Sequence, residues 1–250
     1  MSEDRIAALE AKLAEMEKRL TIREDEMDVK KLQYLYGYLI DKCMYDQVVD
    51  LFADDCEVRF FGGVFKGKAG VKRLYIERFR KRFTHNNNGP VDGFLLDHPQ
   101  IQTIIDIDPD GKTARLRGRS TMQAGRHKDY TYPEKGLNTR QWWEGGLYEN
   151  VYTKGDDGKW RIKLLNYFPH WHADFETGWA YTNPEYVPFL DKLYPEDPAG
   201  PDELYDNFFL WPTHKLLPFH MKHPITGKEM LADRFEDDAE RDAEREAAKR

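Results

Sequence analysis

The stretch LIDKCMYDQVVDLFADDCEVRFFGGVFKGKAGV, residues 39–71, decides how this chain folds. It starts inside a helical pattern, and Gln47–Phe52 adds another helical turn or two. Residues Glu57–Phe61 then alternate in the manner of a strand. The pair Gly62–Gly63 predicts a turn, and Val64–Lys66 a short returning strand with a further helix after it. Helix, hairpin and helix therefore follow one another within about thirty residues.

A helix over Asp28–Tyr45 is expected to open this region, with apolar residues on two sides. One line of residues at helical spacing is Tyr34, Gly37, Tyr38, Asp41 and Tyr45, and a leucine line lies opposite. A helix that is apolar on two sides is buried on two sides. Asp41 is therefore expected to point inward among phenols, where a carboxylate is costly unless hydrogen-bonded or catalytic. The alternatives are a structural partner, such as a Tyr hydroxyl or an Arg, and a place at the solvent-facing rim.

Strand-like stretches dominate the middle of the chain. They are Phe94–Ile107, Thr113–Gln123, Leu147–Thr153 and Trp160–Tyr167, and Asp-Pro-Asp-Gly and Asp-Asp-Gly turns join them in pairs. Residues 124–146 are rich in aromatic residues and glycine and are interpreted as a loop over a pocket. Helices followed by consecutive antiparallel strands predict an α+β fold with a curved sheet wrapped around helices.

Four regions are expected along the chain. Residues 1–27 carry an amphipathic helix with a heptad seam formed by Ile6, Leu9, Leu13, Met16 and Leu20. A short break near Thr21–Asp25 separates it from the core, residues 28–168. A wrapping extension rich in proline and aromatic residues follows over 169–228, and a charged tail over 229–250. The seam docks either on its own domain or on a partner subunit, and the second option favours a homo-oligomer.

Composition excludes several classes of protein. The 250 residues carry a net charge of −7, of which the tail supplies −4, so no strongly basic face is left for nucleic acid. Two cysteines argue against a disulfide framework or a zinc site. No apolar run approaches the ~20 residues that cross a bilayer. We expect a cytoplasmic protein without a membrane partner. An aromatic content of 14% favours a site built from rings.

The order of these elements resembles the SnoaL-like branch of the nuclear-transport-factor-2-like superfamily over roughly residues 28–168. Members show a helix ending in Tyr or Asp, a D-x-x-x-x-L-F-x-D-D segment, a strand, and a G-x-x-x-G entry to the next helix. This sequence matches at Asp46, Leu51–Phe52, Asp54–Asp55 and Gly63–Gly67, and at Trp160–Ile162 in the last hairpin. The resemblance implies a cone-shaped curved sheet whose open end holds the site. Because the family includes isomerases, dehydratases, cyclases and non-enzymes, the chemistry has to be argued from the site.

Members of the scytalone-dehydratase type place an acid on the first long helix and a histidine on the first long strand. That resemblance implies catalytic roles for Asp41 and His98, with the carboxylate orienting the imidazole and raising its pKa toward neutrality. A second histidine of that type is missing, and Arg117 or Arg119 stands nearby instead. Arg119 is expected to hold an oxygen that becomes anionic if its strand face is concave; a convex face would make the arginines surface charges. Tyr34 is expected to orient a hydroxyl.

Further residues are expected to bind substrate. They are Tyr38, Tyr45, Arg117, Trp142, His170 and Trp171. A metal site at His170, His172 and Asp174 is the competing hypothesis, since residues two apart on a strand share a face. We predict no metal, because Pro169 precedes this segment and no other cluster in the sequence completes a site. We also predict no cofactor, because the sequence has no P-loop, G-x-G-x-x-G fingerprint, nucleophile elbow or Cys-His signature.

The long N-terminal helix and the aromatic extension most resemble the cofactorless diarylpropane lyases of lignin-dimer breakdown. This resemblance implies conversion of a 1,2-diarylpropane-1,3-diol to a stilbene through a quinone methide, with release of formaldehyde. The partner would be a small aromatic substrate. Two alternatives stay open at this point. One is a dehydratase or isomerase of a small hydroxylated ring, and the other is a non-catalytic ligand-binding module.

Overall fold

A computed structural model describes residues 3–130, 141–183, 192–205, 210–213, 217–230 and 247. Contacts divide the chain into two compact units, Met1–Trp211 and Pro212–Arg250. The second unit contains an isolated antiparallel bridge between Lys222 and Glu229. Most of the predicted charged tail lies outside the described residues. Among the described helices none is long and apolar enough to cross a membrane.

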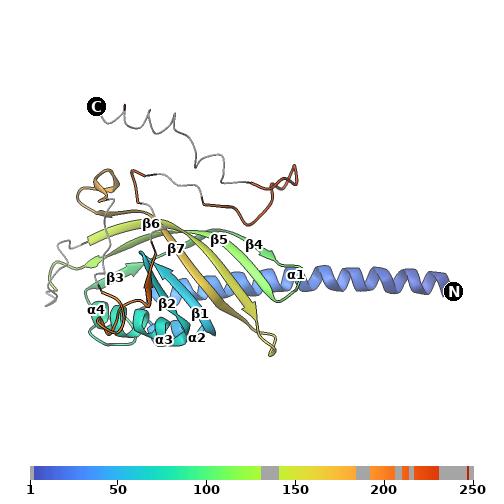
Figure 1. The fold of residues 1–250 in the computed structure, drawn as a ribbon, viewed down its shortest axis with the longest axis horizontal. Coiled ribbons are helices and arrows are strands. Elements are labelled where there is room, and N and C mark those ends of the chain that lie inside the picture. The colour runs from blue at the N-terminus through green and yellow to red at the C-terminus, as the bar shows by residue number, and fades with distance from the viewer. Residues whose placement is uncertain are drawn as a thin grey trace. The chain divides into compact units, whose positions relative to one another are not determined.

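The helices of the first unit come early in the chain. Helix α1 spans Glu3–Asp41 without a break, so the interruption predicted near Thr21–Asp25 is wrong. Figure 1 shows its N-terminal half extending beyond the sheet. The predicted helical turns after it form α2 (Tyr45–Asp50), and the helix expected at Gly67 forms three consecutive pieces. These pieces are α3 (Gly67–Lys72), the π-helix η1 (Arg73–Arg80) and α4 (Lys81–Thr84).

The first unit also contains an eight-stranded curved sheet (Figure 1), and the short 3-10 helix η2 (Trp179–Tyr181) follows the last long strand. Its strands are β1 (Phe52–Phe60), β2 (Gly63–Lys66), β3 (Phe94–Asp97), β4 (Gln100–Ile107), β5 (Thr113–Arg126), β6 (Gln141–Lys154), β7 (Trp160–Asp174) and β8 (Glu203–Leu204). They run in the order β3-β5-β6-β7-β1-β2-β8, with β4 also on β5. Every pair is antiparallel except β1 with β7. The predicted α+β fold with a curved sheet around helices is confirmed.

Three boundaries differ from those predicted. The stretch expected as one strand over 94–107 is interrupted at His98–Pro99, because proline has no N–H for the ladder. Strand β6 begins at Gln141, so residues 141–146 are strand and not loop; residues 131–140 lie outside the described part. Strand β7 continues to Asp174, six residues beyond the predicted end of the core.

Helix α1 is tied to the sheet by a buried carboxylate. Asp25 accepts hydrogen bonds from Lys154 Nζ at 2.6 Å and from Trp160 Nε1 at 2.9 Å, and only 5% of it is exposed. Further along, the hydroxyls of Tyr36 and Tyr75 share a hydrogen bond of 3.0 Å. The face of α1 that meets the sheet is thus the line of Asp25, Val29, Gln33, Tyr36 and Ile40, all buried. A buried charge that is paired and hydrogen-bonded costs far less than an unpaired one.

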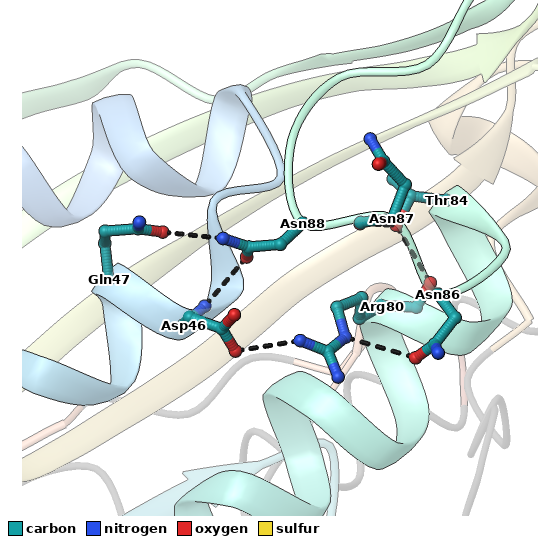
Figure 2. Close-up of polar contacts among 7 residues, drawn as sticks. All are labelled: Asp46, Gln47, Arg80, Thr84, Asn86, Asn87 and Asn88. Carbon is teal, nitrogen blue, oxygen red and sulfur yellow. Dashed lines mark hydrogen bonds and ion pairs between the residues drawn. The ribbon is translucent and has the colours of Figure 1, made fainter.

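A polar loop after α4 joins the helices beside the sheet (Figure 2). Asn88 accepts a hydrogen bond from the backbone N–H of Asp46 at 2.9 Å and donates one to Gln47, so it satisfies an N–H of the first turn of α2. Arg80 lies between the Asp46 carboxylate, at 2.8 Å, and the Asn86 side-chain oxygen, at 3.2 Å. These bonds hold α2 against the end of η1 and fix the entry to β3.

Residues 199–204 of the aromatic extension lie against the helices and the sheet edge of the first unit. Arg73 and Arg78 donate hydrogen bonds to the carbonyl oxygens of Gly200 and Ala199, both at 3.1 Å. Asp202 accepts a bond from the Lys66 backbone N–H at 2.8 Å, and β8 adds to the edge of β2. The extension therefore covers the sheet edge that β2 would otherwise expose.

Candidate active site

An interior cavity of about 100 Å³ lies on the concave side of the sheet. Most of its wall is apolar and aromatic. The lining residues are Tyr36, Ile40, Tyr45, Phe60, Phe61, Phe79, Arg82, Phe83, Phe94, Leu96, His98, Met122, Trp142, Glu144, Tyr148, Tyr167 and His172. They come from helices α1, α2, η1 and α4, from five strands and from the segments that connect them, so the closing of the sheet around the helices creates the cavity. A mostly apolar hollow with a few converging polar groups is the usual form of a small-molecule site.

One carboxyl group faces this cavity. Glu144 on β6 is 5% exposed, and it accepts a hydrogen bond of 2.7 Å from the Tyr167 hydroxyl. Burial raises the pKa of Glu144 to about 7, although the bond from Tyr167 works in the opposite direction. Near neutral pH this group therefore exists in both protonation states. A group with that property is suited to give a proton in one step and take one in the next.

A histidine lies directly across from Glu144. His172 on β7 is its partner in the β6–β7 pairing, and both line the cavity. Burial lowers the pKa of His172 to about 4, so the ring is neutral at pH 7. The neutral imidazole offers one donor and one acceptor beside a titrating carboxyl.

The ring of Tyr167 links the two polar ends of the cavity. Its hydroxyl bonds Glu144, and its ring centre lies 4.9 Å from that of Tyr148. Gly146 makes room for this ring, since a Cβ there would lie 2.7 Å from the Tyr167 hydroxyl and 2.5 Å from the Phe168 carbonyl oxygen. The glycine that suggested a loop is thus required by packing inside a strand.

His98 forms the other polar end of the cavity. The ring is 6% exposed, and its Nε2 shares a hydrogen bond of 2.9 Å with the Tyr148 hydroxyl. Burial lowers the pKa of His98 to about 4. The prediction that Asp41 raises this pKa toward neutrality is wrong, because desolvation of the ring is not offset by a charged partner among the described residues.

A chain of amide side chains leads to the ring of His98. The backbone N–H of Asn166 donates to Asn150 Oδ1 at 2.9 Å, which leaves the Asn150 amide nitrogen to donate to Gln33 Oε1 at 3.0 Å. Gln33 in turn donates to Gln100 Oε1 at 2.7 Å, and the Gln100 amide nitrogen lies 3.1 Å from His98 Nδ1 and 3.2 Å from its Nε2. The chain therefore presents an N–H donor to the neutral imidazole.

Asp41 lies outside the cavity, in the position at the rim that the sequence left open as an alternative. It lines a surface depression with Tyr34, Tyr38, Asp97 and Gln100, and His98 is the residue this depression shares with the cavity. Tyr38 is 72% exposed, so the predicted inward tyrosine face is wrong: Tyr36 and Ile40 turn inward instead. Burial, together with the Asp97 charge, raises the pKa of Asp41 to about 6, while the His98 backbone N–H lowers it. Within the described part, no hydrogen bond joins the Asp41 carboxylate to the His98 ring.

The predicted arginines lie on the convex side of the sheet. Arg117 pairs with Glu149, and Arg119 is exposed; neither lines the cavity. Ser120 and Met122, which alternate with them on β5, turn toward the concave side. The cation that does line the cavity is Arg82 from α4, which the sequence did not single out. Tyr34 reaches Thr103, with 3.4 Å between the hydroxyls, outside the cavity.

Some of the predicted substrate-binding residues line the cavity and others do not. Trp142 and Tyr45 line the cavity. Trp171 packs on the other side of the sheet against Trp143, with ring centres 5.9 Å apart, and His170 is exposed. A bulge where β7 meets Gly145 and Gly146 breaks the alternation between His170 and His172, so the two histidines do not share a face. Among the described residues no three His, Cys, Asp or Glu side chains are close enough to hold a metal.

The catalytic roles predicted for Asp41, His98, Arg119 and Tyr34 remain predictions. Of these four residues, only His98 lines the cavity. Sequence reasoning missed Glu144, Tyr148 and Tyr167. The signal for Glu144 and Tyr148 was the alternation of side chains along β6. Its even-numbered residues from Trp142 to Tyr152 point to one face of the sheet and the odd-numbered residues to the other. This pattern becomes visible once residues 141–146 are recognised as strand.

Comparison with known proteins concerns the fold and the family of this chain. Residues 21–166 match the model of the SnoaL-like domain family, while a search of curated proteins finds no match. The crystal structure of LinA is similar to this chain at 14% identity and a TM-score of 0.50, over 63% of this chain and 93% of LinA. Hexachlorocyclohexane dehydrochlorinase LinA-type3 from Novosphingobium barchaimii LL02 has 15% identity and a TM-score of 0.48, over 62% and 92%. ActVI-ORFA from Streptomyces coelicolor has 17% identity and a TM-score of 0.44, over 57% and 93%.

At these identities the likeness is one of fold. Because the family model spans more than half of the residues, the chain belongs to the SnoaL-like domain family.

Proposed function

We propose that this protein is a cofactor-independent acid–base lyase for a small aromatic molecule, with its chemistry at Glu144. The observation that carries the proposal is a carboxyl group with a pKa raised to about 7, hydrogen-bonded to Tyr167 inside a ring-lined cavity. Such a group is a functional-site candidate because strongly shifted pKa values gather at active sites, where a proton has to be exchanged near neutral pH. The neutral side chains of His98 and His172 supply further donors and acceptors without a fixed charge.

The finer proposal is that the substrate is a diarylpropanediol that carries a phenol. The phenol releases its proton to water and binds as the phenolate. Glu144 in its protonated form gives a proton to the benzylic hydroxyl, water leaves, and the phenolate electrons form a quinone methide. The Glu144 carboxylate then takes the proton of the terminal hydroxyl. The carbon–carbon bond breaks and formaldehyde leaves. The electron pair of that bond forms the stilbene double bond and returns the ring to the phenolate, which takes a proton from water on release. One diol thus gives one stilbene, one formaldehyde and one water, and Glu144 ends in the protonation state in which it began.

Arg82 is the group in this scheme that holds the phenolate oxygen. It lies in the cavity wall beside the rings of Phe83 and Phe94, and its guanidinium is always charged. Stabilisation of a developing anion by a fixed cation in a dry site is worth far more than in water. Arg82 takes here the role that sequence reasoning assigned to Arg119.

Cavity size bears on the substrate. An engineered cavity of ~150 Å³ in another protein binds benzene, and the present one measures about 100 Å³. One aromatic ring occupies most of that space, so the second ring of a diaryl substrate has to lie at the cavity mouth or displace side chains. This observation favours a second candidate, a dehydratase or isomerase of a single hydroxylated ring, with the same acid–base group. The cytoplasmic location belongs to the proposal and accords with two free, buried cysteines.

Product analysis tests the proposal. The purified protein is incubated with a phenolic 1,2-diarylpropane-1,3-diol without added metal or nucleotide, and formaldehyde and stilbene are measured. Equal amounts of both products, lost in Glu144→Gln, support the lyase. A dehydrated product that retains every carbon supports the dehydratase instead. Ligand binding without turnover, unchanged in Glu144→Gln, would show a binding module and contradict the proposal.

A further inference from the structure

The N-terminal half of α1 exposes a line of large apolar side chains. Ile6, Leu9, Leu13, Met16 and Leu20 are between 41% and 64% exposed, and the helix continues past them into the folded domain without a break. Their spacing alternates between three and four residues, which places them at positions a and d of a heptad. A continuous apolar line of this kind on a monomer marks an interaction surface.

This seam faces away from the docked face of the helix. At about 100° per residue, the seam points about half a turn from the line of Asp25, Val29 and Gln33 that packs on the sheet. Figure 1 shows the helix running beyond the sheet along the segment that carries the seam. A second helix laid along it therefore leaves the contacts of Asp25 with Lys154 and Trp160 in place.

The charges that flank the seam distinguish between the two possible directions of a partner helix. All three e positions carry acids and all three g positions carry bases; they are Glu10, Glu17 and Glu24 at e, and Arg5, Lys12 and Arg19 at g. In a parallel pair each g residue meets the e residue of the next heptad on the other chain, which places Lys12 opposite Glu17. In an antiparallel pair g meets g and e meets e, so like charges face each other. The pattern suits a parallel copy of the same helix.

The docked half of α1 removes the main objection to so short a coiled coil. Two to three heptads rarely associate as free peptides, because nucleating a helix is costly. Here the residues from Asp25 onward already hold the helix against the sheet, so the seam is helical before a partner arrives. Association then has only to bring two formed helices together.

We propose that residues 5–24 form a parallel two-stranded coiled coil with the same segment of a second copy of this chain. The apolar core is the seam from Ile6 to Leu20, and the pairs between g and e residues set the direction. Closed two-fold symmetry, in which the same surface is used on both copies, is the commonest arrangement of soluble oligomers. This inference does not depend on the proposed chemistry.

Molar mass in solution tests the association. Light scattering on the full chain is expected to give twice the mass of 29.5 kDa, and Leu13→Glu with Met16→Glu to give half of the wild-type value. Ala14→Glu, outside the seam on the same helix, is the matched control and is expected to leave the mass unchanged. Circular dichroism shows whether each variant keeps its fold. A wild-type monomer, or a mass that the seam variant does not halve, would overturn the proposal.

Crosslinking tests the direction. Leu9→Cys places two thiols side by side in a parallel pair, so mild oxidation is expected to link two chains covalently. An equal mixture of Leu9→Cys and Leu20→Cys that yields mainly the mixed product would indicate an antiparallel pair and contradict the proposal.

Charge reversal gives an independent check. Lys12→Glu is expected to weaken association about tenfold, and adding Glu17→Lys to restore it. Tighter association of Lys12→Glu alone would also contradict a parallel arrangement.

Discussion

Two carboxyl groups on either side of His98 show how the same physical effect leads to different chemistry. Burial raises the pKa of both, that of Asp41 to about 6 and that of Glu144 to about 7. Asp41 lies in a surface depression beside a second acid, Asp97, and next to exposed tyrosines. Glu144 lies in a ring-lined cavity and bonds one hydroxyl. A raised pKa marks both groups and Asp41 Oδ1 is itself buried, but of the two carboxyl groups only Glu144 lines the cavity.

The strongest test of this contrast removes each carboxyl in turn. Glu144→Gln is expected to lower turnover by roughly 10²- to 10⁴-fold, because it removes the group that transfers protons. Asp41→Asn is expected to change turnover by only a few fold, because its carboxyl does not reach the cavity. Steady-state kinetics on the substrate found by product analysis measures both variants. Loss of turnover in Asp41→Asn with retention in Glu144→Gln would reverse the assignment and restore the role that sequence reasoning gave to Asp41.

The pH dependence of the unfolding free energy provides a second comparison, between wild type and Glu144→Gln. The folded protein keeps a proton on Glu144 up to a pKa of about 7, whereas the unfolded chain releases it near 4.5. The stabilising contribution of this group is therefore complete below pH 4.5 and is lost as pH rises through 7. Between these limits Glu144→Gln is expected to gain about 3 kcal/mol in unfolding free energy relative to wild type.

Urea unfolding of both proteins across pH 4 to 8 measures this difference. Titrating groups other than Glu144 are common to both proteins and cancel. A constant offset between the two curves would show that Glu144 titrates normally and would contradict its place in a dry cavity.

A smaller effect concerns the partner of Glu144. The hydrogen bond from Tyr167 lowers the pKa of this carboxyl, so Tyr167→Phe is expected to raise it further. The limb of the pH–rate profile that reports Glu144 then moves to higher pH. Tyr181→Phe, a change at an exposed ring, serves as control. A limb that stays in place, or moves to lower pH, would mean that Tyr167 does not donate to Glu144.

The smallest expected effect concerns the ring of His98. In the wild type the nitrogen chemical shifts of this ring are expected to indicate a neutral imidazole, unchanged between pH 8 and 5. Gln33→Leu interrupts the chain of amides that ends at this ring and is expected to shift these resonances. Asp41→Asn should leave the shifts unchanged. A protonated ring at pH 6 would contradict the burial of His98 and revive its pairing with Asp41.

The fold followed from the sequence because its signals are local. The Asp-Asp-Gly turn and the alternation of Glu57–Phe61 each specify their element within a few residues. The confirmed elements include the hairpin β1–β2 and the helix after it.

The site followed less well, because its position depends on tertiary packing. Helix α1 is apolar on two faces, and periodicity alone does not say whether Tyr36 or Tyr38 turns inward. Glu144 escaped notice because glycines and rings in 141–146 suggested a loop, whereas Gly146 is there to make room for Tyr167. The bulge at His170 separates two histidines that strict alternation places together. Each of these features depends on neighbours distant in the sequence.

The central claim is that the titrating acid of this protein is Glu144, and direct titration of its carboxyl tests that claim. Carbon chemical shifts of labelled glutamate are followed with pH in wild type and in Glu144→Gln, and the resonance missing from the variant belongs to this residue. We expect the titration midpoint of that resonance to lie near pH 7. A midpoint at or below 4.5, the value of an ordinary glutamate, would contradict it.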